Sequence, residues 1–66
     1  MYFKDRGKFI EIDGTRIRKR SIDQFNLRIE EEYFVVITIG GISLCFCVES
    51  EGDGLNLIKK IDKAIT

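Results

Sequence analysis

The stretch Tyr33-Phe-Val-Val-Ile-Thr-Ile-Gly-Gly-Ile-Ser-Leu-Cys-Phe-Cys-Val-Glu49 decides the fold of this chain. Its two halves are rich in β-branched and aromatic residues, which are typical of strands. The Gly40-Gly41 pair predicts a two-residue hairpin turn, so that Ile39 pairs with Ile42. Because side chains alternate along a strand, one face of this hairpin carries only large apolar residues. They are Tyr33, Val35, Ile37, Ile39, Ile42, Leu44, Phe46 and Val48.

The opposite face of the same hairpin is also too apolar for a freely solvated surface. It carries Phe34, Val36, Thr38, Ser43, Cys45 and Cys47. One helix in so short a chain covers one face of a sheet, so the second face should contact another chain unless segment 19–32 shields it. We therefore predict a homo-oligomer whose interface consists of these six residues.

Asp13-Gly14 predicts a second hairpin upstream, between strands over 8–13 and 15–18. In that register Ile10 faces Ile17 and Glu11 faces Arg16, and both pairs are favourable.

Segment 19–32 is ambiguous in its periodicity. Phe25, Leu27 and Ile29 alternate with polar residues, which favours a strand over 24–30. A helix is the alternative, because Ile22, Phe25 and Ile29 also have helical spacing, and Ser21 precedes Gln24 as in a capping box. We choose the strand.

Leu55, Ile58, Ile61 and Ile65 recur at helical spacing and predict a C-terminal amphipathic helix. The predicted fold is α+β: one domain over 1–66, with an antiparallel sheet of four to five strands and this helix packed on one face. The predicted core consists of Ile10, Ile37, Leu44, Phe46, Val48, Leu55, Ile58 and Ile61.

Composition limits the function classes. The 66 residues are 44% hydrophobic and 33% charged, which is typical of a folded domain. The chain has no histidine, the usual residue of acid–base catalysis and zinc sites. No apolar run is long enough to span a bilayer, and the first residues lack the features of a signal peptide. Two cysteines make no disulfide framework, so we expect a cytoplasmic protein with no membrane association.

Two short motifs resemble metal sites. Cys45-x-Cys47 supplies half of a four-sulfur site, but the chain has no second pair, and we interpret both thiols as small buried hydrophobes. Glu49-x-Glu51-x-Asp53-Gly54 resembles the first half of an EF-hand loop, whose position twelve should be glutamate but is Lys60 here. We therefore predict reduced, unbridged cysteines, no bound metal and no cofactor.

Charge is distributed unevenly along the chain. Residues 1–28 have eight basic and four acidic residues, giving +4, and residues 29–66 have three basic and seven acidic residues, giving −4. Arg16, Arg18, Lys19 and Arg20 form a basic cluster that can contact nucleic-acid phosphates. The pI of about 6.2 argues against a dedicated nucleic-acid binder, and a charged edge strand that resists aggregation is the alternative interpretation.

No catalytic constellation is visible, so we do not expect an enzyme. We predict a small protein-interaction module that binds itself and an unidentified protein, or inhibits another macromolecule. Nucleic-acid binding through Arg16 to Arg20 is the alternative. A short free-standing chain is also compatible with an accessory protein of a phage or mobile element, by association alone.

Overall fold

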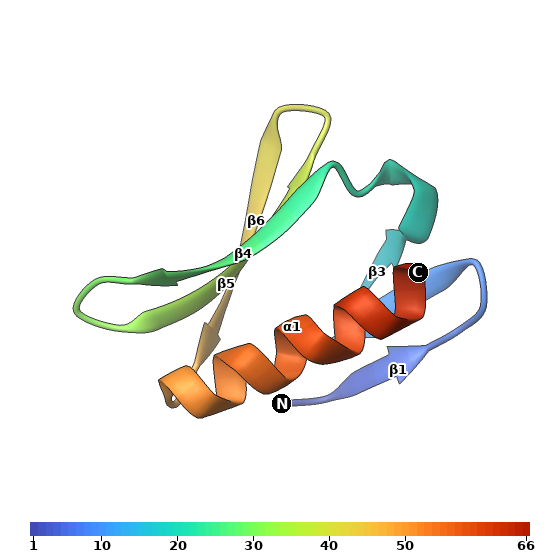
Figure 1. The fold of residues 1–66 in the computed structure, drawn as a ribbon. Coiled ribbons are helices and arrows are strands. Elements are labelled where there is room, and N and C mark those ends of the chain that lie inside the picture. The colour runs from blue at the N-terminus through green and yellow to red at the C-terminus, as the bar shows by residue number, and fades with distance from the viewer.

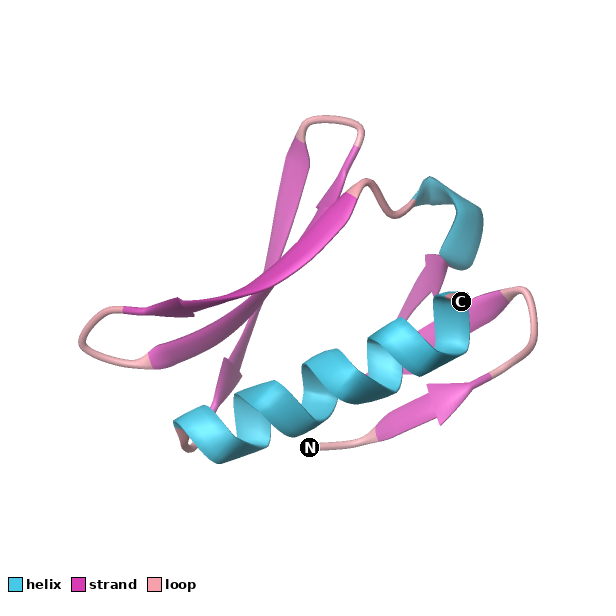
Figure 2. Ribbon diagram, viewed as in Figure 1, coloured by secondary structure: helices cyan, strands magenta, loops and turns pink.

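The computed structural model describes residues 1–66 as two three-stranded antiparallel sheets followed by one helix (Figure 1, Figure 2). Sheet A has the order β1-β2-β3, and sheet B has the order β4-β5-β6. The elements are β1 (Phe3–Asp5), β2 (Phe9–Ile12), β3 (Thr15–Arg18), the 3-10 turn η1 (Lys19–Ser21), β4 (Gln24–Ile29), β5 (Tyr33–Ile39), β6 (Ile42–Val48) and α1 (Glu51–Ile65). The α+β class is confirmed, whereas the prediction of one sheet of four to five strands is wrong.

The break between the sheets lies at η1. There the chain leaves β3, turns through Lys19–Ser21, and enters sheet B beside β5. Asp23 holds this entry in place: its N–H donates to the Thr38 carbonyl (2.8 Å), and its Oδ2 accepts from the Gly40 N–H (2.7 Å). The Asp23 carboxylate therefore links the start of β4 to the β5–β6 turn. The strand interpretation of residues 24–30 is confirmed, with bounds Gln24–Ile29.

Both predicted hairpins have the expected register. Ile10 lies opposite Ile17, and Ile39 lies opposite Ile42. At the first turn Asp13 and Gly14 have φ of 47° and 87°, the positive values that a two-residue turn of this kind requires. Strand β1 was not predicted, because three residues are too few to show a periodicity.

The core lies between the inner faces of the two sheets and α1. Its buried members are Ile10, Ile12, Ile17, Val35, Ile37, Val48, Leu57 and Ile61. Four predicted core residues are more exposed than expected, because Leu44, Phe46 and Ile58 are half-buried and Leu55 is 47% exposed. The helix packs mainly on β4 and β5, so the inner residues of the edge strand β6 are only partly covered.

Helix α1 begins at a well-formed cap and approaches sheet B closely. Ser50 Oγ accepts from the Asp53 N–H (3.1 Å), as an N-cap residue does. Gly54 is buried, and a Cβ placed on it would lie 2.6 Å from Leu27 Cδ1 and 3.4 Å from Val48 Cγ2. The missing side chain lets the helix lie against β4. This helix lacks the length and apolar character needed to cross a membrane.

Substitution of the two helix glycines should therefore have opposite effects. Gly54→Leu should destabilise the fold by about 1–3 kcal/mol, because its side chain has no room against Leu27 and Val48. Gly52 is exposed, and a Cβ added there would meet only Ser50 Oγ, at 3.8 Å, so Gly52→Ala should stabilise by about 0.5 kcal/mol. Urea unfolding followed by circular dichroism measures both; equal effects would contradict the close approach.

Candidate interaction surfaces

The outer face of sheet B, on the side away from α1, is not covered by any other element. Segment 19–32 forms η1 and then β4, which extends the same sheet at its edge. The alternative in which this segment shields the face is therefore excluded. Three cross-strand rows make up the face: Arg28, Phe34 and Cys47; Asn26, Val36 and Cys45; Gln24, Thr38 and Ser43.

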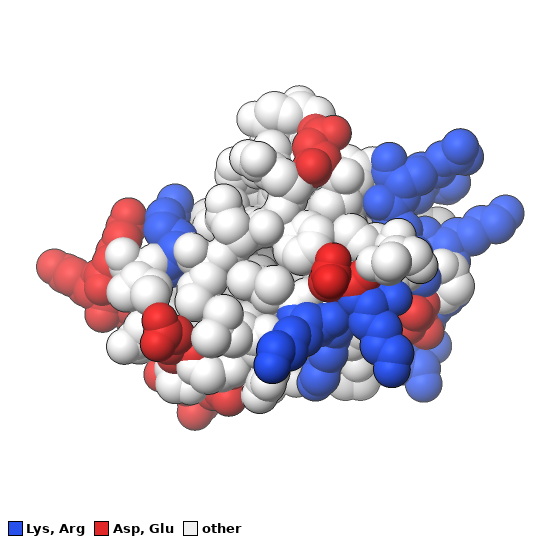
Figure 3. All heavy atoms as spheres, viewed as in Figure 1, with Lys and Arg blue, Asp and Glu red and all other residues white.

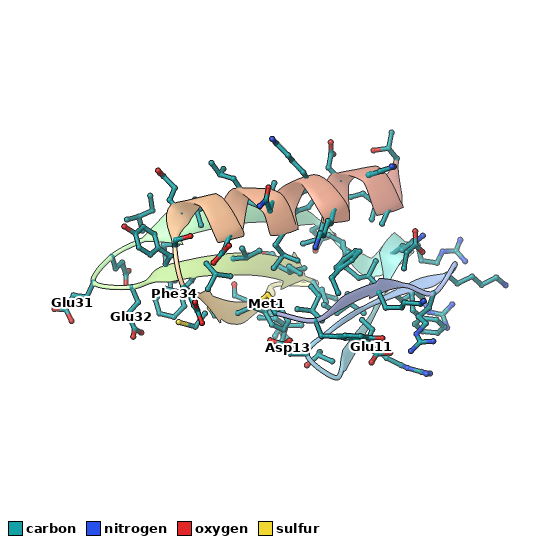
Figure 4. All side chains as sticks on the ribbon, turned by 90° about the horizontal axis from the view of Figure 1, so that it is seen from below. Met1, Glu11, Asp13, Glu31, Glu32 and Phe34 are labelled. Atoms are coloured by element: carbon teal, nitrogen blue, oxygen red, sulfur yellow. The ribbon has the colours of Figure 1, made fainter.

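The centre of this outer face is apolar and its margin is polar. Val36 lies in the middle row and is 9% exposed, because its neighbours on three strands surround it. Phe34 lies on the side of sheet B opposite α1 (Figure 4), and the guanidinium carbon of Arg28 sits 5.3 Å from its ring centre. The Arg28 N–H also points at Cys45 Sγ, 3.9 Å away. The predicted interface residues therefore share one surface. Arg28 also belongs to this surface, although the sequence analysis did not include it.

Cys45 and Cys47 are both free and both exposed on this face. Their interpretation as small buried hydrophobes is therefore wrong. Cys47 Sγ lies 4.0 Å from Glu32 Oε2 in the β4–β5 turn, a weak thiol-to-carboxylate contact. No group of three or more cysteine, aspartate or glutamate side chains gathers as a metal site requires.

Strand β6 differs from the other edge strands in its charge. Charged residues occur in β1, β3 and β4, each at an edge of its sheet, whereas β6 has none over Ile42–Val48. Charges on edge strands prevent unwanted pairing with other chains. The outer face of sheet B therefore ends at an edge without this protection.

Comparison with protein-family models, with curated proteins and with solved structures finds no match for this chain. Function must therefore be inferred from the surfaces themselves.

The second candidate interaction surface is basic. Lysine and arginine gather mostly at one end of the molecule, and acidic residues gather mostly at the other (Figure 3), where Glu31 and Glu32 lie in the β4–β5 turn (Figure 4). The uneven charge in the sequence thus becomes a separation in space.

The structure divides the basic cluster predicted from sequence. Arg18, Lys19 and Arg20 line a shallow pocket of about 260 Å³, and the fourth lining residue is Lys8. Arg16 lies outside this pocket and faces Glu11, with 3.8 Å between Nε and Oε1. Lys8 joins the pocket because the Lys19 N–H donates to its carbonyl (3.0 Å). Sequence analysis missed Lys8, since only tertiary structure brings it to η1.

Arg18 is held in place by an aromatic ring. Its guanidinium carbon lies 5.2 Å from the ring centre of Phe9, its cross-strand partner. Stacking uses the flat face of the guanidinium and leaves the N–H groups at its edge available.

Asp5 is the one carboxylate paired with this pocket. The pKa of Asp5 is lowered, chiefly because Lys19 Nζ donates to its Oδ1 (2.8 Å) and also because the Gly7 N–H donates to it (2.9 Å). The ion pair joins β1 to η1. It also neutralises part of the charge of Lys19.

Asp5→Asn should lower stability slightly at neutral pH and have less effect in acid. A lowered folded-state pKa contributes stability above the unfolded value of about 3.9, and this contribution disappears as the pH falls through the folded-state pKa. The effect should be small because the pair is solvated. Melting temperatures of both proteins across an acid series measure it. A difference that widens toward low pH would contradict this assignment.

Proposed function

We propose that this chain is a protein-interaction module that associates with a second copy through the outer face of sheet B. The observation that carries the proposal is the apolar centre of this face, where the exposed Cys45 lies beside the half-buried Phe34 and beside Val36, which is 9% exposed. Such a centre with a polar margin is the usual anatomy of a protein interface. The oligomer then binds or inhibits another protein.

The chemistry of the face suits stacking of two sheets. Facing sheets lie about 10 Å apart with interdigitated side chains. Small side chains at Thr38, Ser43 and Cys45 permit that approach, and Phe34 supplies bulk beside them. A two-fold axis is the default for two copies, because it buries the same patch on both.

The two thiols provide a direct readout of this association. In a dimer Cys45 and Cys47 are covered, so their alkylation by iodoacetamide should slow as protein concentration rises through the micromolar range. Sedimentation in reducing buffer should show the mass doubling over the same range. Alkylation independent of concentration, together with a monomer throughout, would exclude the proposed interface.

Nucleic-acid binding is the second candidate function. The observation that favours it is the spatial separation of charge, which places a pocket lined only by basic residues at one end of the molecule. Phosphate backbones are attracted to such surfaces with affinity that falls steeply as salt rises.

A further inference from the structure

The pocket at the η1 end of sheet A has donors with no protein partner. Lys8, Arg18 and Arg20 line it, and none of them forms an ion pair or a side-chain hydrogen bond. The fourth lining residue, Lys19, is paired with Asp5. Three cations therefore converge on one concave site without a neutralising carboxylate in its lining.

These donors have the geometry that a phosphate group needs. A guanidinium presents a planar fork of N–H groups that matches two phosphate oxygens. The Arg18 guanidinium carbon lies 5.2 Å from the ring centre of Phe9, and its N–H groups form no side-chain hydrogen bond, so that fork is free. Lys8 lies in the β1–β2 turn and Arg20 lies in η1, so segments far apart in sequence supply the charges of this pocket.

The lining distinguishes between two sources of phosphate, nucleic acid and an anionic membrane. Stable attachment to a membrane generally needs apolar residues that enter the bilayer beside the basic ones. This pocket has no hydrophobic residue in its lining. Elsewhere in sheet A, Arg6 and Arg16 both pair with Glu11 and are partly neutralised by it, whereas the two arginines of the pocket have no carboxylate partner.

We propose that Lys8, Arg18 and Arg20 form a phosphate-binding site for a nucleic-acid backbone, with Arg16 outside it; this inference rests on the second candidate function. Asp5 limits affinity by pairing with Lys19. Its removal should strengthen binding, whereas loss of a cation from the pocket should weaken it.

Fluorescence anisotropy of a short labelled oligothymidylate, titrated with the full chain at low salt, tests the site. Arg20→Gln and Lys8→Gln should each weaken binding about tenfold, because each removes a charged hydrogen-bond donor. Arg16→Gln is the matched control and removes the same charge outside the pocket, so it should change affinity less than about twofold. Asp5→Asn should strengthen binding. The slope of log affinity against log salt should be about −2 for three contacts.

The contrary results separate failure of the pocket from failure of the function. Absence of any binding by the wild-type chain at low salt would overturn nucleic-acid binding as a function. Binding that Arg16→Gln weakens as much as Arg20→Gln would retain that function but overturn the pocket. Tighter binding to anionic phosphatidylserine vesicles than to the oligonucleotide would overturn the choice of ligand, and full competition by equimolar inorganic phosphate would show a site for free phosphate instead.

Discussion

Ile37→Ala should destabilise this protein by about 2–5 kcal/mol, which approaches the whole stability of a domain of this size. Ile37 is fully buried at the centre of β5, the middle strand of sheet B. Phe25 and Leu44 are its cross-strand neighbours on the inner face. Truncation there leaves a cavity that no neighbouring strand can close without disturbing both pairings.

The control for Ile37→Ala is Ile42→Ala, because Ile42 lies in the same sheet but is 67% exposed. Its truncation should cost well under about 1 kcal/mol. Ile37→Val is a milder variant, expected to lose about 0.5–1.5 kcal/mol, in case the alanine variant does not fold. Urea unfolding monitored by far-ultraviolet circular dichroism gives all three values. Equal losses at positions 37 and 42 would contradict the difference in burial between these two residues of the same face.

Phe46→Ala tests how far sequence alone can identify the core. Alternation along the strand places Phe46 on the inner face, and on that basis its loss would cost as much as a fully buried aromatic, about 3–5 kcal/mol. In the structure Phe46 is half-buried, because α1 lies over β4 and β5 and leaves β6 at the rim. We therefore expect a smaller loss than for Ile37→Ala, in the same unfolding measurement.

Local features of the sequence were sufficient for the hairpins but not for the arrangement of the sheets. The registers at Asp13-Gly14 and Gly40-Gly41 follow from turn chemistry and alternation, which act over a few residues. The burial of Ile12 and Ile17 follows from the packing of sheet A against sheet B, a non-local event. Alternation identifies two faces of a strand and does not determine which of them is covered.

Gly54 shows a related limit in the helix. The spacing of large apolar residues suggested a core face that includes Leu55, yet the buried face runs through Gly54, Leu57 and Ile61. Glycine carries no apolar side chain, so a periodicity of hydrophobic residues cannot detect it. Gly54 faces Leu27, and Leu55 lies at the flank of that face and is 47% exposed.

The candidate sites differ in how much of each the sequence could reveal. The six residues predicted for the outer face of sheet B share one strand pair, so alternation alone brings them together. The basic pocket combines η1 with Lys8, which a backbone hydrogen bond from Lys19 holds nearby. The basic pocket therefore excludes Arg16, which the sequence placed in the cluster, and includes Lys8 from the β1–β2 turn.

Val36→Glu should abolish the proposed self-association while the chain still folds. Burial of an unpaired carboxylate at the centre of two stacked faces costs several kcal/mol, enough to raise the dissociation constant at least about a hundredfold. Val36 is only 9% exposed, but it lies on the outer face of sheet B, where a longer glutamate side chain can extend past its strand neighbours into solvent. Sedimentation at the concentration where wild type is dimeric measures the loss.

Two further substitutions make the outcome decisive. Asn56→Glu adds the same charge on the exposed side of α1 and should leave association unchanged. Cys45→Glu puts the charge at an exposed position of the outer face, where it cannot disturb the core, and should also give a monomer. If Val36→Glu unfolds the chain, Cys45→Glu decides the matter alone. Wild-type association in a folded Cys45→Glu variant would show that the two copies meet elsewhere.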